Sequence, residues 1–175
     1  MNRSAGLFVG RLTHENGVGV LLEALDLFPG ARVDVVGLGP EGGKLAPHPQ
    51  LRLLGEISLA EMQECMARAA YLVMPSLACE RTPRPVIEAF ANALPVIASR
   101  VGKLAELVEP GRNGFLFQSG SARDLARYLA WAAAFPEKMR QMGECAKADY
   151  QARFIADWSY QSLFGERRRT ARFAG

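Results

Sequence analysis

Short apolar runs alternate along the chain with longer stretches in which apolar residues recur at helical spacing. The apolar runs have the length and content of buried strands, and they cover residues 7–9, 33–36, 51–55, 71–74, 95–98 and 115–117. The helical stretches cover residues 18–28, 58–69, 86–93 and 104–108. From residue 122 onward the pattern is helical, with a break at Pro136 and a weaker pattern around Asp157.

This alternation predicts an α/β fold, a Rossmann-like three-layer α/β/α arrangement around a parallel sheet. The strands are apolar on both faces, which indicates that helices cover both sides of the sheet. A chain of 175 residues is long enough for one such domain and too short for two. We therefore expect a single domain over residues 1–175, with C-terminal helices from about 122 to 172. Sheets of this kind bind ligands beyond the carboxyl ends of their strands, so the loops there are the candidates for chemistry.

Composition and charge narrow the partners only a little. The chain is 49% hydrophobic and 22% charged with a net charge of +3, which is globular composition and indicates no nucleic-acid partner. Its three cysteines lie far apart without a Cys/His cluster, so we expect neither a structural zinc site nor disulfides, and a cytoplasmic setting. The sequence shows no signal peptide and no apolar run near the ~20 residues of a membrane span. Peripheral contact with a membrane stays open.

The first candidate loop follows the first predicted strand and reads Gly10-Arg11-Leu12-Thr13-His14-Glu15-Asn16-Gly17. A glycine at the end of a strand lets a bulky anion approach the backbone, and the following helix offers free N–H groups at its N-terminus. Arg11 adds a fork of donors that suits phosphate oxygens. An arginine in this position is also a common surface residue, and we interpret His14 as an ordinary loop residue.

The second candidate loop, Gly37-Leu38-Gly39-Pro40-Glu41, fails as a dinucleotide fingerprint. Pro40 and the short stretch after it do not give the G-x-G-x-x-G pattern, and no long helix follows. We interpret this loop as a tight strand-to-helix turn, with a place in the wall of the crevice as a further possibility.

The third candidate is the stretch 75–90, in which Glu80 and Glu88 have seven residues between them. The prolines confine the helix to the region from about Pro85 onward, so Glu80 falls in the loop and Glu88 just inside the helix. A carboxylate accepts two hydroxyl hydrogen bonds at once, as a vicinal sugar diol requires. Spacing alone supports equally a simpler interpretation, in which Glu88 favours a helix N-terminus and Glu80 is a solvated acid.

Four segments in this order resemble the family-four retaining glycosyltransferases, which have the GT-B fold of two Rossmann-like lobes. The segments read GRLTHENG, VVGLGPE, PSLACERTPRPVIEAFANALPVIAS and VGKLAELVEPGRNGFLF. The resemblance runs from Gly6 to about Phe164 and corresponds to the C-terminal, nucleotide-sugar-binding lobe. It implies a transferase of carbohydrate biosynthesis that uses a UDP-, GDP- or ADP-sugar as donor substrate. It implies no cofactor and no metal ion.

The resemblance also assigns roles to single residues. Arg11 and Glu80 are the implied catalytic residues, with Arg11 at the diphosphate, Glu80 at the sugar hydroxyls and Glu88 at the ribose. The implied donor-binding residues are Gly10, Arg11, Asn16, Gly55, Glu56, Ile57, Glu80, Arg81, Thr82, Pro83, Arg84 and Glu88. Within this set the loop 55–57 is expected to lie against the base, and the backbone of 81–84 against sugar and phosphate.

This chain departs from the family pattern at a few positions. Asn16 stands where the family has a lysine that pairs with the arginine on the diphosphate, and Leu94 stands for a glycine before Pro95. Arg81 or Lys103 is a candidate for the missing cation. The N-terminal acceptor lobe of the family is absent, so we expect it in a missing segment or a partner chain. Two alternatives remain, a non-catalytic nucleotide-sugar-binding or partner subunit that kept the fold, and an epimerase-like relative, for which the paired acids are not expected.

Overall fold

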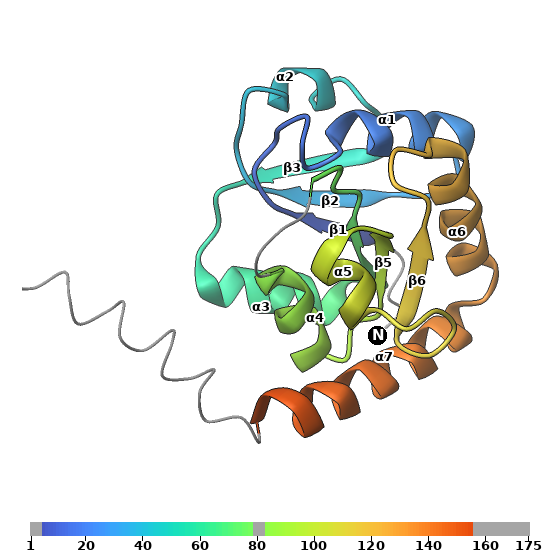
Figure 1. Cartoon of the computed structure of the whole chain (residues 1–175). Coiled ribbons are helices and arrows are strands. Elements are labelled where there is room, and N and C mark those ends of the chain that lie inside the picture. Colours follow the sequence, from blue (N-terminus) through green and yellow to red (C-terminus); the bar gives the residue numbers. More distant parts are fainter. Residues whose placement is uncertain (1–4, 79–82, 156–175) are drawn as a thin grey trace, which may run out of the picture.

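The computed structural model describes residues 5–78 and 83–155. Within them six parallel strands form one sheet in the order β3-β2-β1-β4-β5-β6 (Figure 1). The strands are β1 (Gly6–Val9), β2 (Val33–Val36), β3 (Leu51–Gly55), β4 (Tyr71–Met74), β5 (Val96–Ser99) and β6 (Gly114–Phe117). The chain builds outward from β1 to β3 and then returns to β4 on the other side of β1. A parallel sheet with this reversal has its crevice between β1 and β4.

Helices cover both faces of the sheet, as the sequence predicts (Figure 1). The described helices are α1 (Val18–Leu27), α2 (Gly42–Leu45), α3 (Leu59–Arg68), α4 (Arg84–Ala91), α5 (Gly102–Leu107), α6 (Ala122–Ala134) and α7 (Pro136–Tyr150), followed by a π-helical turn, Gln151–Ile155. Buried side chains of α1, α2 and α6 share one core cluster, and those of α3, α4 and α5 share the other. Alternation along the strands supplies both clusters, so Leu72 faces one and Val73 the other. None of these helices is long and apolar enough to cross a membrane.

Most predicted elements stand within two residues of their expected bounds, and the Rossmann-like fold class is confirmed. Ser58 caps α3 in a capping box: its hydroxyl accepts from the Glu61 N–H, and the Glu61 carboxylate accepts from the Ser58 N–H. The break at Pro136 is real, because this proline opens α7.

Three expectations need correction. β3 is an edge strand whose Arg52 and Leu53 are exposed, so it is not apolar on both faces. A four-residue helix, α2, lies in a stretch where the sequence pattern predicts no helix. The helix that carries Glu88 starts at Arg84 and ends at Ala91, two residues before the expected bounds at both ends. It ends there because the Asn92 side chain donates to the Glu88 carbonyl and Ala93 adopts a left-handed backbone with φ of 53°.

Candidate donor site

An open hollow of about 700 Å³ lies at the carboxyl ends of β1 and β2. Gly10 and Arg11 line it on one side and Glu56 and Ile57 on another, with the turn 37–39 between them. The structure therefore brings the first predicted loop and the predicted base-side loop into one concave surface. It also places the Gly37–Gly39 turn in the wall of that surface.

The two glycines of this turn allow two backbones to lie against each other. A methyl group on Gly37 would lie 2.0 Å from the Gly10 carbonyl oxygen, and one on Gly39 would lie 2.3 Å from the Leu12 carbonyl oxygen. Hydrogen bonds tie the same backbones together, from Gly10 N–H to the Val36 carbonyl (3.0 Å) and from Leu12 N–H to the Leu38 carbonyl (3.0 Å). The glycines thus serve close packing of the walls of the hollow.

The opposite end of the first loop is held against the segment after β4. Gly17 has a left-handed backbone with φ of 76°, and a methyl group there would lie 1.8 Å from the Pro75 carbonyl oxygen. The Leu77 N–H donates to the Glu15 carbonyl at 2.7 Å. The first loop is therefore fixed between the β2 turn and the start of the loop that leads to Glu80.

Charged side chains lie at the exposed rim of the first loop. Arg11, His14 and Glu15 are exposed, which agrees with the interpretation of His14 as an ordinary loop residue. Glu15 accepts from its own backbone N–H and from the Thr13 hydroxyl, and these hydrogen bonds hold the pKa of its carboxyl below the ordinary value. The side chain of Asn16 donates to the Arg11 carbonyl with an Nδ2–O distance of 2.7 Å.

On the base side, Gly55 ends β3 with a left-handed φ of 68°, and its carbonyl accepts the Gly37 N–H at 2.9 Å. This bond joins the loop 55–57 to the wall of the hollow. Ile57 is half-buried against the core cluster of α3 and α4, whereas Glu56 is exposed. An apolar face beside an exposed acid can take one face and one polar edge of a planar base.

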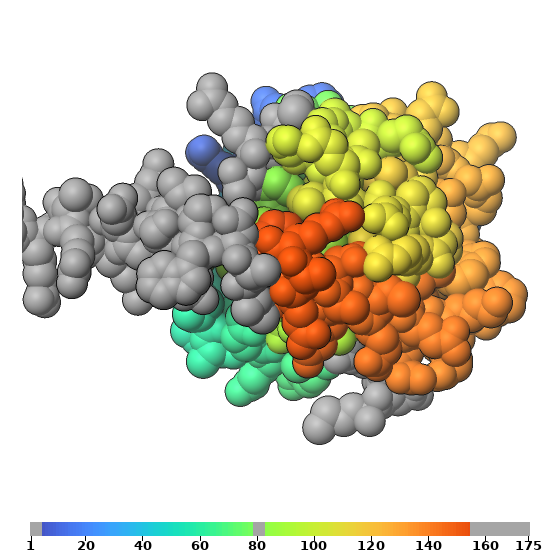
Figure 2. Space-filling model, turned by 60° about the horizontal axis from the view of Figure 1, so that its bottom comes forward, coloured from blue at the N-terminus to red at the C-terminus, as the bar shows by residue number. Residues whose placement is uncertain are grey.

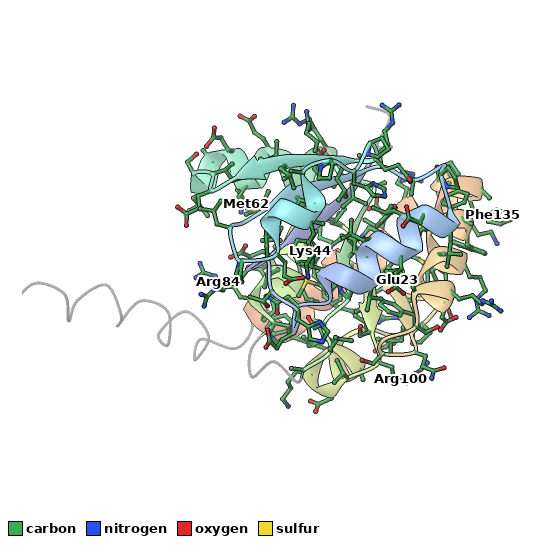
Figure 3. The ribbon with its side chains drawn as sticks, turned by 90° about the horizontal axis from the view of Figure 1, so that it is seen from above. Glu23, Lys44, Met62, Arg84, Arg100 and Phe135 are labelled. Atoms are coloured by element: carbon green, nitrogen blue, oxygen red, sulfur yellow. The ribbon has the colours of Figure 1, made fainter. Side chains whose placement is uncertain are left out.

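Glu88 lies in the second turn of α4, further inside the helix than we expected. Its Oε1 accepts from Arg84 Nε at 2.8 Å, one turn earlier on the same helix. The Arg84 side chain is exposed and projects from the edge of the molecule (Figure 3). Pro83 is buried immediately before the helix. Glu80, Arg81 and Thr82 lie outside the described residues, so their predicted roles stay predictions.

Two other sequence candidates find local roles. Lys103 pairs with Glu106 on α5, with an Nζ–Oε2 distance of 2.6 Å. Leu94 is buried with an ordinary backbone, and the left-handed position that suits glycine is Ala93 beside it. Among the described residues, no three His, Cys, Asp or Glu side chains gather in a group that could hold a metal ion.

Sequence reasoning missed the contact between Gly17 and Pro75 and the bond between Asn16 and Arg11. The glycine itself was visible as a helix-start signal, but its neighbour Pro75 lies 58 positions later in the chain, directly after β4. The short spacing of Asn16 and Arg11 allows a side-chain-to-backbone bond, which is the signal that could have found it.

Comparison with known proteins decides the family. Residues 3–149 match the family model described as glycosyl transferases group 1. The chain belongs to this family. Among the relatives of this glycosyltransferase domain is a D-inositol 3-phosphate glycosyltransferase of Streptomyces griseus. The two sequences are 36% identical over an alignment that covers 95% of the chain and 40% of the relative. The chain thus spans less than half of the length of that relative.

Solved structures agree with the fold of this glycosyltransferase domain. Anabaena HepE, crystallised in complex with UDP and glucose, superposes with a TM-score of 0.80 at 25% identity, over 96% of this chain and 49% of HepE. The C-terminal domain of a group 1 glycosyl transferase from Francisella tularensis superposes with a TM-score of 0.74 at 19% identity, over 88% of both chains. The second likeness concerns the fold alone. The expected lobe of the GT-B type is confirmed.

Proposed function

We propose that this chain binds a nucleoside-diphosphate sugar and forms the donor-binding lobe of a glycosyltransferase that transfers a hexose with retention of configuration. The observation that carries the proposal is the single hollow that joins Gly10 and Arg11 to Glu56 and Ile57. Its volume of about 700 Å³ suits a ligand of this size. The complex of the related HepE with UDP and glucose supports the ligand class.

The loops of the hollow divide the ligand between them. Arg11, at the exposed rim beside a backbone that the glycines bring close, takes the diphosphate. There its guanidinium stabilises the negative charge that develops on the leaving diphosphate, a contribution made mainly in the transition state. Ile57 and Glu56 take the base, and the loop that contains Glu80 takes the sugar hydroxyls.

Glu88 takes the ribose in this arrangement. A carboxylate has about four lone-pair sites, so the bond from Arg84 leaves capacity for two ribose hydroxyls. Glu80 and the backbone of 81–82 complete the donor site in the proposal.

The test is a calorimetric titration of this chain with UDP-, GDP- and ADP-sugars and with the matching free diphosphates. We expect one base to bind clearly better than the other two. Arg11→Met should weaken that binding by about tenfold, because it removes a charge-assisted contact. Arg32→Met is the matched control, because Arg32 is exposed just before β2, at the amino-terminal ends of the strands and away from the hollow. A wild-type chain that binds none of these ligands contradicts the proposal.

The acceptor and the retaining outcome need the rest of the enzyme, either as the remaining length that relatives have or as a partner chain. Retention is tested with a protein that contains this chain and an acceptor lobe, by proton NMR of the product linkage. An inverted linkage contradicts it.

A non-catalytic binding subunit is the second candidate, and Asn16 is the observation that favours it. The side chain is neutral and turned to the Arg11 carbonyl, at a position where the resemblance places a cation. This candidate predicts donor binding without transfer even when an acceptor lobe is supplied.

A further inference from the structure

We propose that Asn16 is a positioning residue of the donor site, which acts by holding the backbone of Arg11. This inference rests on the proposed function, because it concerns the loop that takes the diphosphate. It assigns to Asn16 a role different from that of the lysine it replaces. The lysine contributes charge, whereas Asn16 contributes a fixed loop.

The local geometry shows a loop closed on itself. Asn16 Nδ2 donates to the Arg11 carbonyl at 2.7 Å, across five positions of the chain. The backbone N–H of Asn16 donates to Thr13 Oγ1 at 3.4 Å, and the Gly17 N–H donates to the His14 carbonyl at 2.9 Å. A methyl group on Gly10 would lie 3.6 Å from Asn16 Nδ2, so the amide lies beside the end of β1.

The wider geometry shows why this bond matters. The start of the loop is paired with the β2 turn through Gly10 and Leu12, and its end is fixed to the segment after β4 through Glu15 and Gly17. The side chains of Arg11, His14 and Glu15 face solvent along this loop. The Asn16 amide is a side-chain tie from the second anchor to the residue that carries the predicted phosphate donor.

A protein side chain whose backbone is already fixed loses less conformational entropy when it contacts a ligand. By fixing the Arg11 carbonyl, Asn16 restricts the backbone conformation of Arg11, whose side chain lines the hollow. Its contribution to binding therefore passes through Arg11 and concerns phosphate. It does not extend to the base or the ribose.

The test is a double-mutant cycle in the full 175-residue chain, with Asn16→Leu, Arg11→Met and the double variant. Leucine has the shape of asparagine without its donor or any charge. Each variant is titrated by calorimetry with UDP, GDP or ADP, whichever the wild-type chain binds best, and with the matching nucleoside. We expect Asn16→Leu to weaken diphosphate binding about fivefold, as for one lost hydrogen bond, and to leave nucleoside binding unchanged. In the Arg11→Met background the second substitution should have no further effect.

Gln50→Leu is the matched control, because Gln50 Nε2 donates to the Phe28 and Ala31 carbonyls. These bonds lie at the amino-terminal ends of the strands, away from the hollow. This variant loses comparable bonds and should keep diphosphate affinity. Equal losses for diphosphate and nucleoside, or additive losses in the cycle, overturn the proposal for Asn16. A wild-type chain that binds no diphosphate overturns the proposed function instead. If Asn16→Leu does not fold, Asn16→Ala replaces it in the same cycle.

Discussion

Gly17, Gly37 and Gly39 each stand where a side chain would collide with a neighbouring backbone. The sequence shows these glycines at the ends of predicted strands and before a predicted helix, so turns could be predicted there. The partner of each contact could not, because Pro75 and Leu12 approach only when the sheet assembles. The same holds for Asn16, whose neutral side chain is visible in the sequence and whose bond to Arg11 is not.

Glu88 is the residue whose two interpretations differ most in their consequences. If it accepts both ribose hydroxyls, Glu88→Ala removes charged hydrogen bonds of about 1.5–3 kcal/mol each, before water compensates. We expect donor affinity to fall at least about tenfold by calorimetry. Stability to urea should fall by only about 0.5 kcal/mol, the usual value of an exposed pair such as that with Arg84.

Glu106→Ala provides the control for this prediction. Glu106 forms a comparable exposed pair with Lys103 on α5, so its loss should change neither donor affinity nor stability by much. Unchanged donor affinity in Glu88→Ala, with a large loss of stability, would support the simpler interpretation of a structural helix residue.

Asn16→Lys tests the charge that this chain lacks at the diphosphate. The lysine forfeits the bond to the Arg11 carbonyl and adds a cation beside Arg11. At low ionic strength we expect tighter binding of the diphosphate, with a steeper loss of affinity as salt is added. Binding of the free nucleoside should not change. If neither the affinity nor its salt dependence moves, position 16 does not face the phosphates.

Ala93 has a left-handed backbone with φ of 53°, which costs a residue with a Cβ about 1–2 kcal/mol. Ala93→Gly relieves this strain and gives back part of the gain through the more flexible unfolded chain. We expect a net stabilisation of about 0.5–1 kcal/mol in urea denaturation. Ala91→Gly, in the last turn of α4, should destabilise instead. A loss of stability in both variants would count against the strain at Ala93.

At the scale of elements, α7 is joined to the loop between α5 and β6 by a polar cluster in which Asn113 and Asp149 are buried and Arg112 is exposed. The Arg112 guanidinium donates to both oxygens of Asp149, at 2.7 Å each, and Asn113 Nδ2 donates to Asp149 Oδ2 at 2.9 Å. Asn113 also accepts the Glu109 N–H and donates to the Leu107 carbonyl. Figure 2 shows α7, in orange and red, against the yellow segment that contains this loop.

The cluster makes stability depend on pH. Burial raises the pKa of Asp149, but the hydrogen bonds from Arg112 and Asn113 and the charge of Arg112 outweigh it, so the pKa of this carboxyl lies below its ordinary value. A carboxyl whose pKa is lowered by folding stabilises the protein at pH values above its pKa in the unfolded chain. This contribution is lost as the pH falls from that pKa through the pKa in the folded protein. We expect Asp149→Asn to cost about 1–3 kcal/mol at pH 7. The difference from the wild type should shrink toward pH 3 in urea denaturation, and a constant difference would contradict the prediction.

Element positions were largely predictable, because strand length and helical spacing are local properties. The bounds of α4 were not. The helix starts at Arg84, and its end at Ala91 depends on the Asn92 side chain and the left-handed Ala93. α2 was missed because four residues carry no periodicity.

At the scale of the whole molecule, the candidate site lies at the carboxyl ends of β1 and β2, beside the point where the strand order reverses between β1 and β4. We expect the isolated chain to bind a nucleoside diphosphate and to transfer no sugar, because the hollow offers the donor side alone. The measurement is product formation from donor sugar and a broad panel of acceptors, with hydrolysis of the donor followed in parallel. Robust transfer by this chain alone would overturn the expectation.

The sequence by itself determined the class of fold, the place of each strand and the loops at which to look, because apolar periodicity and glycine position act over a few residues. It also determined the family, since four motifs stand in order along the chain. Only the tertiary structure decided which loops meet. Gly10 and Arg11 share a hollow with Glu56 and Ile57 because β1, β2 and β3 pair in register, and Gly17 reaches Pro75 because β4 pairs with β1. These contacts join residues far apart in the chain, and hydrogen bonding between strands sets them.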